Sequence, residues 1–205
     1  NKCYIAKDPQ RKPEGIPHET VRDNGRLNVV FLSRICEKKN LLGAIQILEN
    51  AKGNVNFSIY GNIEDENYYN LCVQEMSKLK NNITCEYKGI ADSEDVPKIL
   101  SQYDVFLFPT HGENFGHVIS EALSAGVIPV ISDTTPWLDF KEYNAGYVIN
   151  HSDLAAFTEC IDLLSSVDEN KLKEMSANVI DYYARQYNDS ITNNGYTEMF
   201  DELLR

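Results

Sequence analysis

Short apolar runs alternate along the chain with stretches in which apolar residues recur every three or four positions. Several short runs are apolar at nearly every position, which is typical of strands buried on both faces of a parallel sheet. The wider spacing is typical of helices that bury one face. The predicted strands are residues 27–32, 54–60, 83–87, 105–108, 128–132 and 146–149. The predicted helices are residues 41–48, 69–79, a segment capped by 93–95 and ending at 102, 116–125, 154–164, 170–185 and 191–204.

Because predicted strands and helices alternate strictly, we expect right-handed crossovers and a parallel sheet between two helix layers. The predicted fold class is therefore α/β, a Rossmann-like three-layer α/β/α domain with about six parallel strands. Residues 1–24 are polar and contain three prolines, so we expect a linker or extension there and one domain over residues 25–205. The sequence begins without Met, and we expect it to be part of a longer protein.

Two carboxylates follow the strand predicted at 105–108. Glu113 lies in a glycine-containing loop, and Glu121 lies about a turn and a half into the next helix if that helix starts near Gly116. This loop is expected at the carboxyl edge of the sheet, where open α/β proteins bind ligands. Amides at a helix N-terminus suit a phosphate, and carboxylates can accept hydrogen bonds from sugar hydroxyls. The simpler alternative is that Glu113 is a loop charge and Glu121 a solvated helix residue.

Cations and glycines follow the other predicted strands. Arg34 and Lys39 come after the first strand, where a forked arginine contact and a lysine point charge would fit a diphosphate. They could equally be ordinary surface cations. Gly61 and Gly89 end the second and third strands, either to let a nucleotide approach the backbone or simply to form turns.

The sequence from Glu113 to Asp133 resembles the Glu-x7-Glu signature of retaining glycosyltransferases of group 1 (family 4), which have the GT-B fold. Thr134-Thr135-Pro136-Trp137 is similar to some bacterial members, and the resemblance covers residues 29–148. It implies that the chain is the C-terminal, donor-binding half of such an enzyme. The donor would be a nucleotide-diphosphate sugar, with uridine or guanosine as its nucleoside. The acceptor is unknown, with polysaccharide or glycolipid synthesis as the setting. Without its N-terminal acceptor domain, the fragment alone is expected to be inactive.

The resemblance also implies roles for individual residues. Glu113 would contact the sugar hydroxyls while its loop amides hold the distal phosphate, and Glu121 would hold the ribose. Arg34 and Lys39 would neutralise the leaving diphosphate. Ser33 and Asn40 stand where glycine is common in the family, and Lys38 could replace Lys39 as the working amine. The further candidates for substrate binding are Asn114, Phe115, Gly116, His117, Gly61 and Ile90, with a positioning or packing role favoured for His117.

Composition narrows the possible partners. The net charge of −12 argues against nucleic acid and against a basic membrane-docking face. No apolar run approaches the roughly 20 residues of a membrane-spanning helix. The five cysteines are scattered without C-x-x-C spacing, and no Asp-x-Asp pair occurs, so we expect reduced thiols, no bound metal and no cofactor beyond the donor. We expect a cytoplasmic location, with any peripheral membrane contact made through the absent N-terminal domain.

Two alternatives remain open from the sequence. One is a module that binds a nucleotide or nucleotide sugar without catalysis, and the other is a sugar-nucleotide epimerase of similar architecture, which would lack the Glu-x7-Glu pattern. The sequence has neither G-x-G-x-x-G after its first strand nor G-x-x-x-x-G-K-[ST], so dinucleotide-binding and P-loop proteins are disfavoured.

Overall fold

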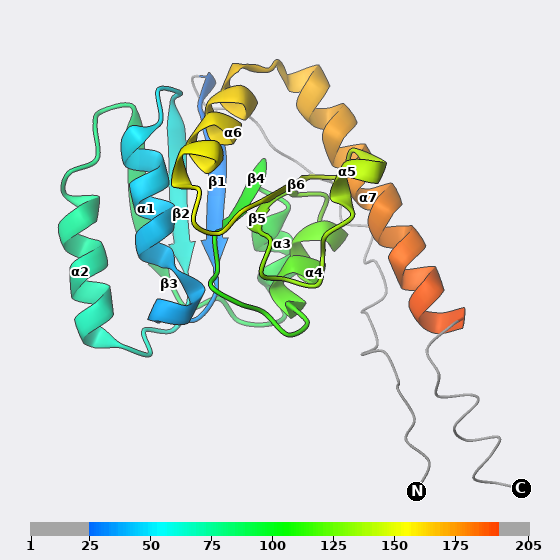
Figure 1. Cartoon of the computed structure of the whole chain (residues 1–205), viewed down its shortest axis with the longest axis horizontal. Coiled ribbons are helices and arrows are strands. Elements are labelled where there is room, and N and C mark those ends of the chain that lie inside the picture. The colour runs from blue at the N-terminus through cyan, green and yellow to red at the C-terminus, as the bar shows by residue number, and fades with distance from the viewer. Residues whose placement is uncertain (1–24, 193–205) are drawn as a thin grey trace, which may run out of the picture.

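The structure is a computed structural model that describes residues 25–192. Its centre is a sheet of six parallel strands in the order β3-β2-β1-β4-β5-β6 (Figure 1). The strands are β1 (Leu27–Leu32), β2 (Val55–Tyr60), β3 (Ile83–Gly89), β4 (Val105–Phe108), β5 (Ile128–Ser132) and β6 (Tyr147–Ile149). All six predicted strands are confirmed, with ends shifted by no more than two residues, and so is the predicted fold class.

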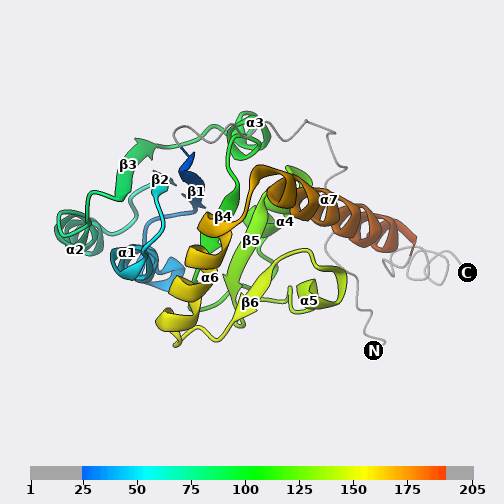
Figure 2. The same ribbon diagram turned by 90° about the horizontal axis from the view of Figure 1, so that it is seen from above.

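Helices cover both faces of the sheet. The helices are η2 (Glu37–Lys39, a 3-10 turn), α1 (Leu41–Asn50), α2 (Glu66–Met76), α3 (Val96–Leu100), α4 (His117–Ser124), α5 (Phe140–Tyr143), α6 (Leu154–Ser166) and α7 (Glu169–Thr192). Helices α1, α2 and α6 lie on one face, and α3, α4 and α7 lie on the other (Figure 2). Because the sheet lies between these layers, its central strands are buried on both sides.

Burial follows the apolar pattern of the sequence. All four residues of β4 and all five residues of β5 are buried, which explains why neither strand alternates with polar residues. At the sheet edge, β3 instead exposes Thr84, Glu86 and Lys88 in alternation with less exposed neighbours. This alternation is expected of a strand with one solvated face.

The helices differ from the prediction in several places. Helix α2 begins and ends three residues earlier than predicted, and the 3-10 turn η2 had not been predicted. Helix α7 runs without a break from Glu169 to Thr192, so the predicted interruption between residues 185 and 191 is wrong. Helix α3 is only five residues long, and its N-cap Asp95 makes no side-chain capping bond, so the predicted cap and length are also wrong. Pro97 is tolerated because it lies in the first turn, where backbone amides lack helical partners anyway. Helix α5 had not been predicted.

Parts of the predicted organisation lie outside the described residues. These are the linker or extension at residues 1–24 and residues 193–204 of the last predicted helix. Within residues 25–192, no helix combines the length and the apolar character needed to cross a membrane.

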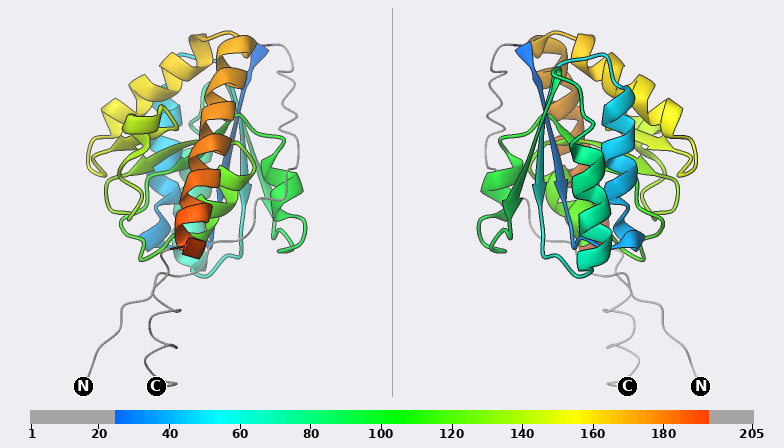
Figure 3. Two further views of the ribbon diagram at one scale, coloured as in Figure 1. Left: turned by 90° about the vertical axis from the view of Figure 1, so that its right-hand side faces the viewer. Right: turned by 90° about the vertical axis from the view of Figure 1, so that its left-hand side faces the viewer.

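The strand order reverses between β1 and β4. The chain moves outward from β1 to β3 and then returns to place β4 on the other side of β1. Open α/β sheets generally bind ligands at the carboxyl edge beside such a reversal. Helix α7 runs along the height of the molecule (Figure 3), and its second half flanks the loop after β4, since Tyr182 and Asn114 line one pocket.

Candidate functional site

Asn40 joins the loops that follow β1 and β4. Its backbone is left-handed, with φ of 58°, a conformation that asparagine tolerates better than most residues. Its side-chain oxygen accepts the Gly43 N–H at 3.0 Å and caps α1, while its amide nitrogen donates to the Pro109 carbonyl at 2.8 Å. The Asn40 side chain therefore caps α1 and also connects the two loops. Ser33 does not adopt a left-handed backbone, so glycine is not required there.

The two loops are further tied together through the Lys38 carbonyl. It accepts the His111 N–H at 2.9 Å and the Thr110 hydroxyl at 3.0 Å. The Thr110 carbonyl in turn accepts the hydroxyls of Ser132 and Thr134, at 2.6 and 2.8 Å. Hydrogen bonds therefore connect the ends of β1, β4 and β5 into one floor beneath the candidate site.

On this floor Lys39 and Glu113 form an ion pair, although they are 74 positions apart in the sequence. Their side chains are only 10% and 12% exposed. Burial, together with the nearby Arg34 and Lys38 cations, lowers the pKa of Lys39 below its ordinary value. Apart from the paired Glu113 carboxylate, the surroundings of this ammonium therefore disfavour its charged form.

Arg34 and Lys38 are more accessible than Lys39. The Arg34 guanidinium donates to both oxygens of Glu64, at 3.0 and 2.8 Å, and the two side chains are 59% and 46% exposed. An ion pair in water contributes little, so Arg34 can exchange this partner at small cost. The exposed Lys38 side chain lies beside Gly112, with its Cε 3.8 Å from where a Gly112 Cβ would be.

The acidic residues 64–66, which follow β2, have defined positions. Glu64 pairs with Arg34, and the Asp65 carboxylate accepts the Tyr68 N–H at 3.0 Å. Asp65 therefore caps α2, and Glu66 is the first residue of that helix.

The loop after β4 leads directly into the N-terminus of α4. The Glu113 N–H donates to the Thr134 carbonyl at 3.1 Å, and Gly116 is the N-cap of α4 with φ of 78°. The exposed Asn114 and the partly buried Phe115 lie between them, and the Phe115 ring is 4.6 Å from that of His117. Glu121 is the fifth residue of α4 and is partly exposed, as predicted from the helical spacing. The amides at this helix end and both glutamates thus belong to one loop–helix unit.

The glycines at the ends of β2 and β3 lie along the same edge. A Cβ on Gly61 would be 1.7 Å from the Ser33 carbonyl oxygen, so only glycine lets these two chain segments approach so closely. The Gly61 N–H donates to the Gly89 carbonyl at 2.9 Å, and Ile90 beyond it is 68% exposed. Gly61 therefore serves the close approach of the loop that carries Arg34.

Comparison with known proteins adds to this geometry. Residues 14–184 match the family described as "Glycosyl transferases group 1". The chain belongs to this family. Among curated relatives, it is 25% identical over 203 residues to an uncharacterized 41.2 kDa protein in the cps region of Klebsiella pneumoniae, covering 96% of the chain and 52% of that protein. It is 26% identical over 161 residues to the capsular polysaccharide biosynthesis glycosyltransferase CapM of Staphylococcus aureus, covering 77% and 40%. The chain thus spans about half the length of these relatives.

Solved structures share the fold of this group 1 family member. Anabaena Alr3699/HepE in complex with UDP and glucose matches with a TM-score of 0.72 and 19% identity, over 88% of the chain and 48% of HepE. The C-terminal domain of the group 1 family protein LpcC from Francisella tularensis matches with a TM-score of 0.65 and 20% identity, over 90% and 95%. The Helicobacter pylori cholesterol-α-glucosyltransferase catalytic domain matches with a TM-score of 0.64 and 16% identity, over 78% and 98%.

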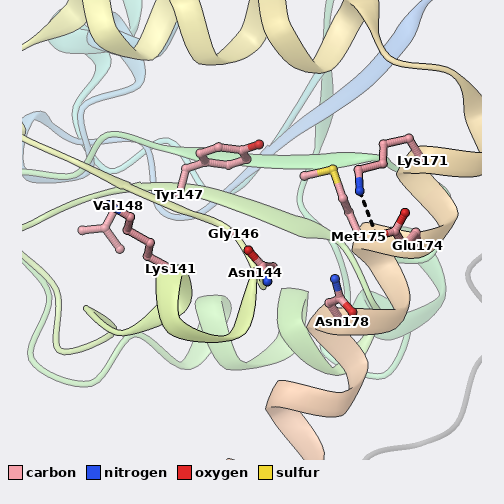
Figure 4. Close-up of a pocket in the computed structure, with 9 residues that line it drawn as sticks. All are labelled: Lys141, Asn144, Gly146, Tyr147, Val148, Lys171, Glu174, Met175 and Asn178. Carbon is pink, nitrogen blue, oxygen red and sulfur yellow. Dashed lines mark hydrogen bonds and ion pairs between the residues drawn. The ribbon is translucent and has the colours of Figure 1, made fainter.

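In this group 1 family member, a pocket of about 480 Å³ lies away from the carboxyl edge of the sheet. It opens between the start of β6 and the first half of α7, and the Lys171 ammonium in it is turned toward Glu174 at 2.8 Å (Figure 4). Its lining residues are Lys141, Asn144, Gly146, Tyr147, Val148, Lys171, Glu174, Met175 and Asn178. Because Gly146 precedes β6, this pocket is at the amino end of that strand and not part of the candidate site.

A smaller pocket of about 350 Å³ borders the loop after β4. Its lining residues are Asn114, Phe115, Pro136, Trp137, Leu138, Asp139, Tyr182 and Gln186. Trp137 was not among the candidate site residues, although the sequence Thr134–Trp137 resembles that of other family members. No local pattern in the sequence links Trp137 to this loop, because its contacts there are with the carbonyl and the ring of Phe115, 22 positions away.

Proposed function

We propose that this chain is the donor-binding half of a retaining glycosyltransferase of the GT-B type, which takes a sugar from a nucleotide-diphosphate sugar. The carrying observation is the nearly buried Lys39–Glu113 pair at the carboxyl edge of the sheet. A cation and a carboxylate held side by side there offer one partner for a diphosphate and one for a sugar. We propose that residues 25–205 form this domain and that the remainder of a longer enzyme supplies the acceptor half.

The relatives support this proposal. HepE has been described with UDP and glucose and also with UDP-glucose, and CapM is a glycosyltransferase of capsular polysaccharide synthesis. The matching LpcC structure is itself a C-terminal domain. We therefore favour a UDP-sugar as donor and polysaccharide or glycolipid synthesis as the process.

The roles follow from the charges of the site. Transfer of the sugar leaves negative charge on the diphosphate, and fixed cations nearby stabilise this developing charge. We assign that task to Lys39 and to Arg34, which would release Glu64 to reach the donor. Glu113 would accept hydrogen bonds from the sugar hydroxyls, and Glu121 from the ribose. The amides from Asn114 to His117 would hold the distal phosphate, and Gly61 and Ile90 would border the base.

We further propose that this binding needs no metal ion, because arginine, lysine and helix amides together can neutralise a diphosphate. We also propose a cytoplasmic location, with any membrane contact made by the acceptor half.

Thermal unfolding in the presence of nucleotide sugars tests the proposal. A ligand that binds only the folded chain raises the melting temperature by mass action. We expect UDP-sugars to raise it, with and without EDTA, and ATP or NAD to have little effect. A chain that responds to no nucleotide sugar would contradict the proposal. A chain that binds UDP-glucose but belongs to a full-length protein without transferase activity would be the non-catalytic module.

A further inference from the structure

The loop from Glu113 to Gly116 is held from one side by the segment that follows β5. Its first residue, Glu113, donates its N–H to the Thr134 carbonyl at 3.1 Å. Near its other end, the Phe115 carbonyl accepts the indole N–H of Trp137 at 2.7 Å. Both ends of the loop are therefore held by hydrogen bonds to the same short segment.

Trp137 is itself fixed firmly. It is 6% exposed, and its ring lies 6.4 Å from that of Phe140 and 6.3 Å from that of Tyr182. Tyr182 is in turn anchored by a hydrogen bond from its hydroxyl to Asp139 at 2.6 Å. The indole is thus a rigid support built from α5 and α7 behind the loop.

The contact lies where the loop becomes helix α4. Gly116 has a left-handed backbone with φ of 78°, and a Cβ on it would be 3.6 Å from the indole nitrogen. The Phe115 ring also meets the indole edge-on, with centroids 6.2 Å apart. A change at Trp137 would consequently alter the direction of the amides at the start of α4.

We propose that Trp137 is a positioning residue for the donor, which sets where the loop presents its amides and Glu113 to the distal phosphate and the sugar. This inference rests on the proposed function, since it gives the loop a ligand to orient. Trp137 itself touches no donor atom in this account and acts only through the Phe115 carbonyl.

The test compares Trp137→Phe with the wild-type chain. Phenylalanine keeps an aromatic ring but removes the N–H donor, and Leu138→Ala is the matched control because Leu138 is the exposed next residue. Calorimetric titrations use UMP, UDP and UDP-glucose. We expect Trp137→Phe to weaken the binding of UDP and UDP-glucose by about two- to tenfold, the range for one lost hydrogen bond. The affinity for UMP should not change, because UMP lacks the distal phosphate. Leu138→Ala should match the wild type for all three.

The outcomes separate the two proposals. If the wild-type chain binds neither UDP nor UDP-glucose, the proposed function fails and the role of Trp137 falls with it. If the wild type binds but Trp137→Phe weakens all three ligands alike, or none of them, the positioning role alone is wrong.

A second measurement needs no variant. Trp137 is the single tryptophan of the chain, so the protein's indole fluorescence reports directly on this contact. Because the proposal makes the buried indole a preformed support, we expect its emission to change little when UDP-glucose or UMP binds. A large change in emission on binding of UDP-glucose would show that the indole moves away from this position and would overturn the proposal.

Discussion

At the scale of single residues, Lys39 and Glu113 pair with each other, although the proposed roles assign each of them to a different part of the donor. Without donor, each charge neutralises the other in a nearly buried position. With donor, the proposed roles assign the cation to the diphosphate and the carboxylate to the sugar. Removing one member should therefore affect the two parts of the donor differently.

We expect Glu113→Gln and Glu121→Gln to have different effects on the binding of UDP and UDP-glucose. Glu113→Gln frees Lys39 from its carboxylate, so UDP should bind equally well or more tightly. UDP-glucose should bind less well, because one carboxylate oxygen that would accept from a sugar hydroxyl becomes an amide nitrogen. Glu121→Gln should weaken UDP and UDP-glucose alike, because the ribose is common to both. Titrations of both ligands against both variants decide this. Loss of UDP binding in Glu113→Gln together with a silent Glu121→Gln would reverse the assigned roles.

The three cations of the site should also contribute differently to the affinity for UDP. We expect Arg34→Ala and Lys39→Ala each to weaken the binding of UDP by about 1.5–3 kcal/mol, the range for hydrogen bonds to charged groups. The binding of uridine should be unaffected. Lys38→Ala is the matched control and should have the smaller effect. Calorimetry with UDP and uridine measures this, and a larger loss in Lys38→Ala would show that Lys38 is the working amine.

At the scale of elements, the connection between η2 and α1 shows how a loop is held in place. Asn40 combines a left-handed backbone, a helix cap and a bond to the end of β4. The first of these depends on the backbone and the other two on the side chain, so substitutions can separate them.

We expect Asn40→Gly to cost about 1 kcal/mol of unfolding free energy, because the cap and the bond to Pro109 are lost while the backbone stays relaxed. Asn40→Ala should cost about 1–2 kcal/mol more, because alanine is strained at a φ of 58°. Urea unfolding of the two variants measures the difference. An alanine variant as stable as the glycine variant would show that the strain argument is incorrect.

The elements that could be predicted from the sequence are those with a strong apolar pattern. The strand at Val105–Phe108 is apolar at every position, and the helix after Gly116 has clear spacing. Helix α5 is too short to show any period. The continuous course of α7 was missed because the segment near Gln186 and Asp189 is polar, although nothing in it terminates a helix. The pairing of Lys39 with Glu113 depends on strand order, which no local pattern reveals.

At the scale of the whole molecule, the described residues form one layered domain, and the proposed donor site lies at the carboxyl edge of its sheet, beside the loops after β1 and β4. An open edge lets a donor enter, but it also lets water reach the reacting atoms and weakens every charge interaction there. A transferase additionally needs its acceptor oriented against the donor.

We therefore expect the 205-residue chain to bind UDP-glucose but to transfer almost no sugar. Adding the acceptor half, within the full-length enzyme, should restore transfer. Single-turnover assays with radiolabelled donor compare the two proteins at equal concentration. Transfer by the chain alone at a rate near that of the full-length enzyme would contradict the two-domain interpretation.

The position of β1 between β2 and β4 also has a consequence for the order of assembly during synthesis. Val29 pairs with Phe57, only 28 residues further along the chain, whereas its partner on the other side, Val105, follows 76 residues after it. During that interval the edge of β1 that will meet β4 is unpaired, and an open apolar strand edge invites association with other chains. Contacts this distant in sequence also slow folding. The same reversal of strand order that places the loops after β1 and β4 side by side therefore makes the nascent chain dependent on the later synthesis of β4.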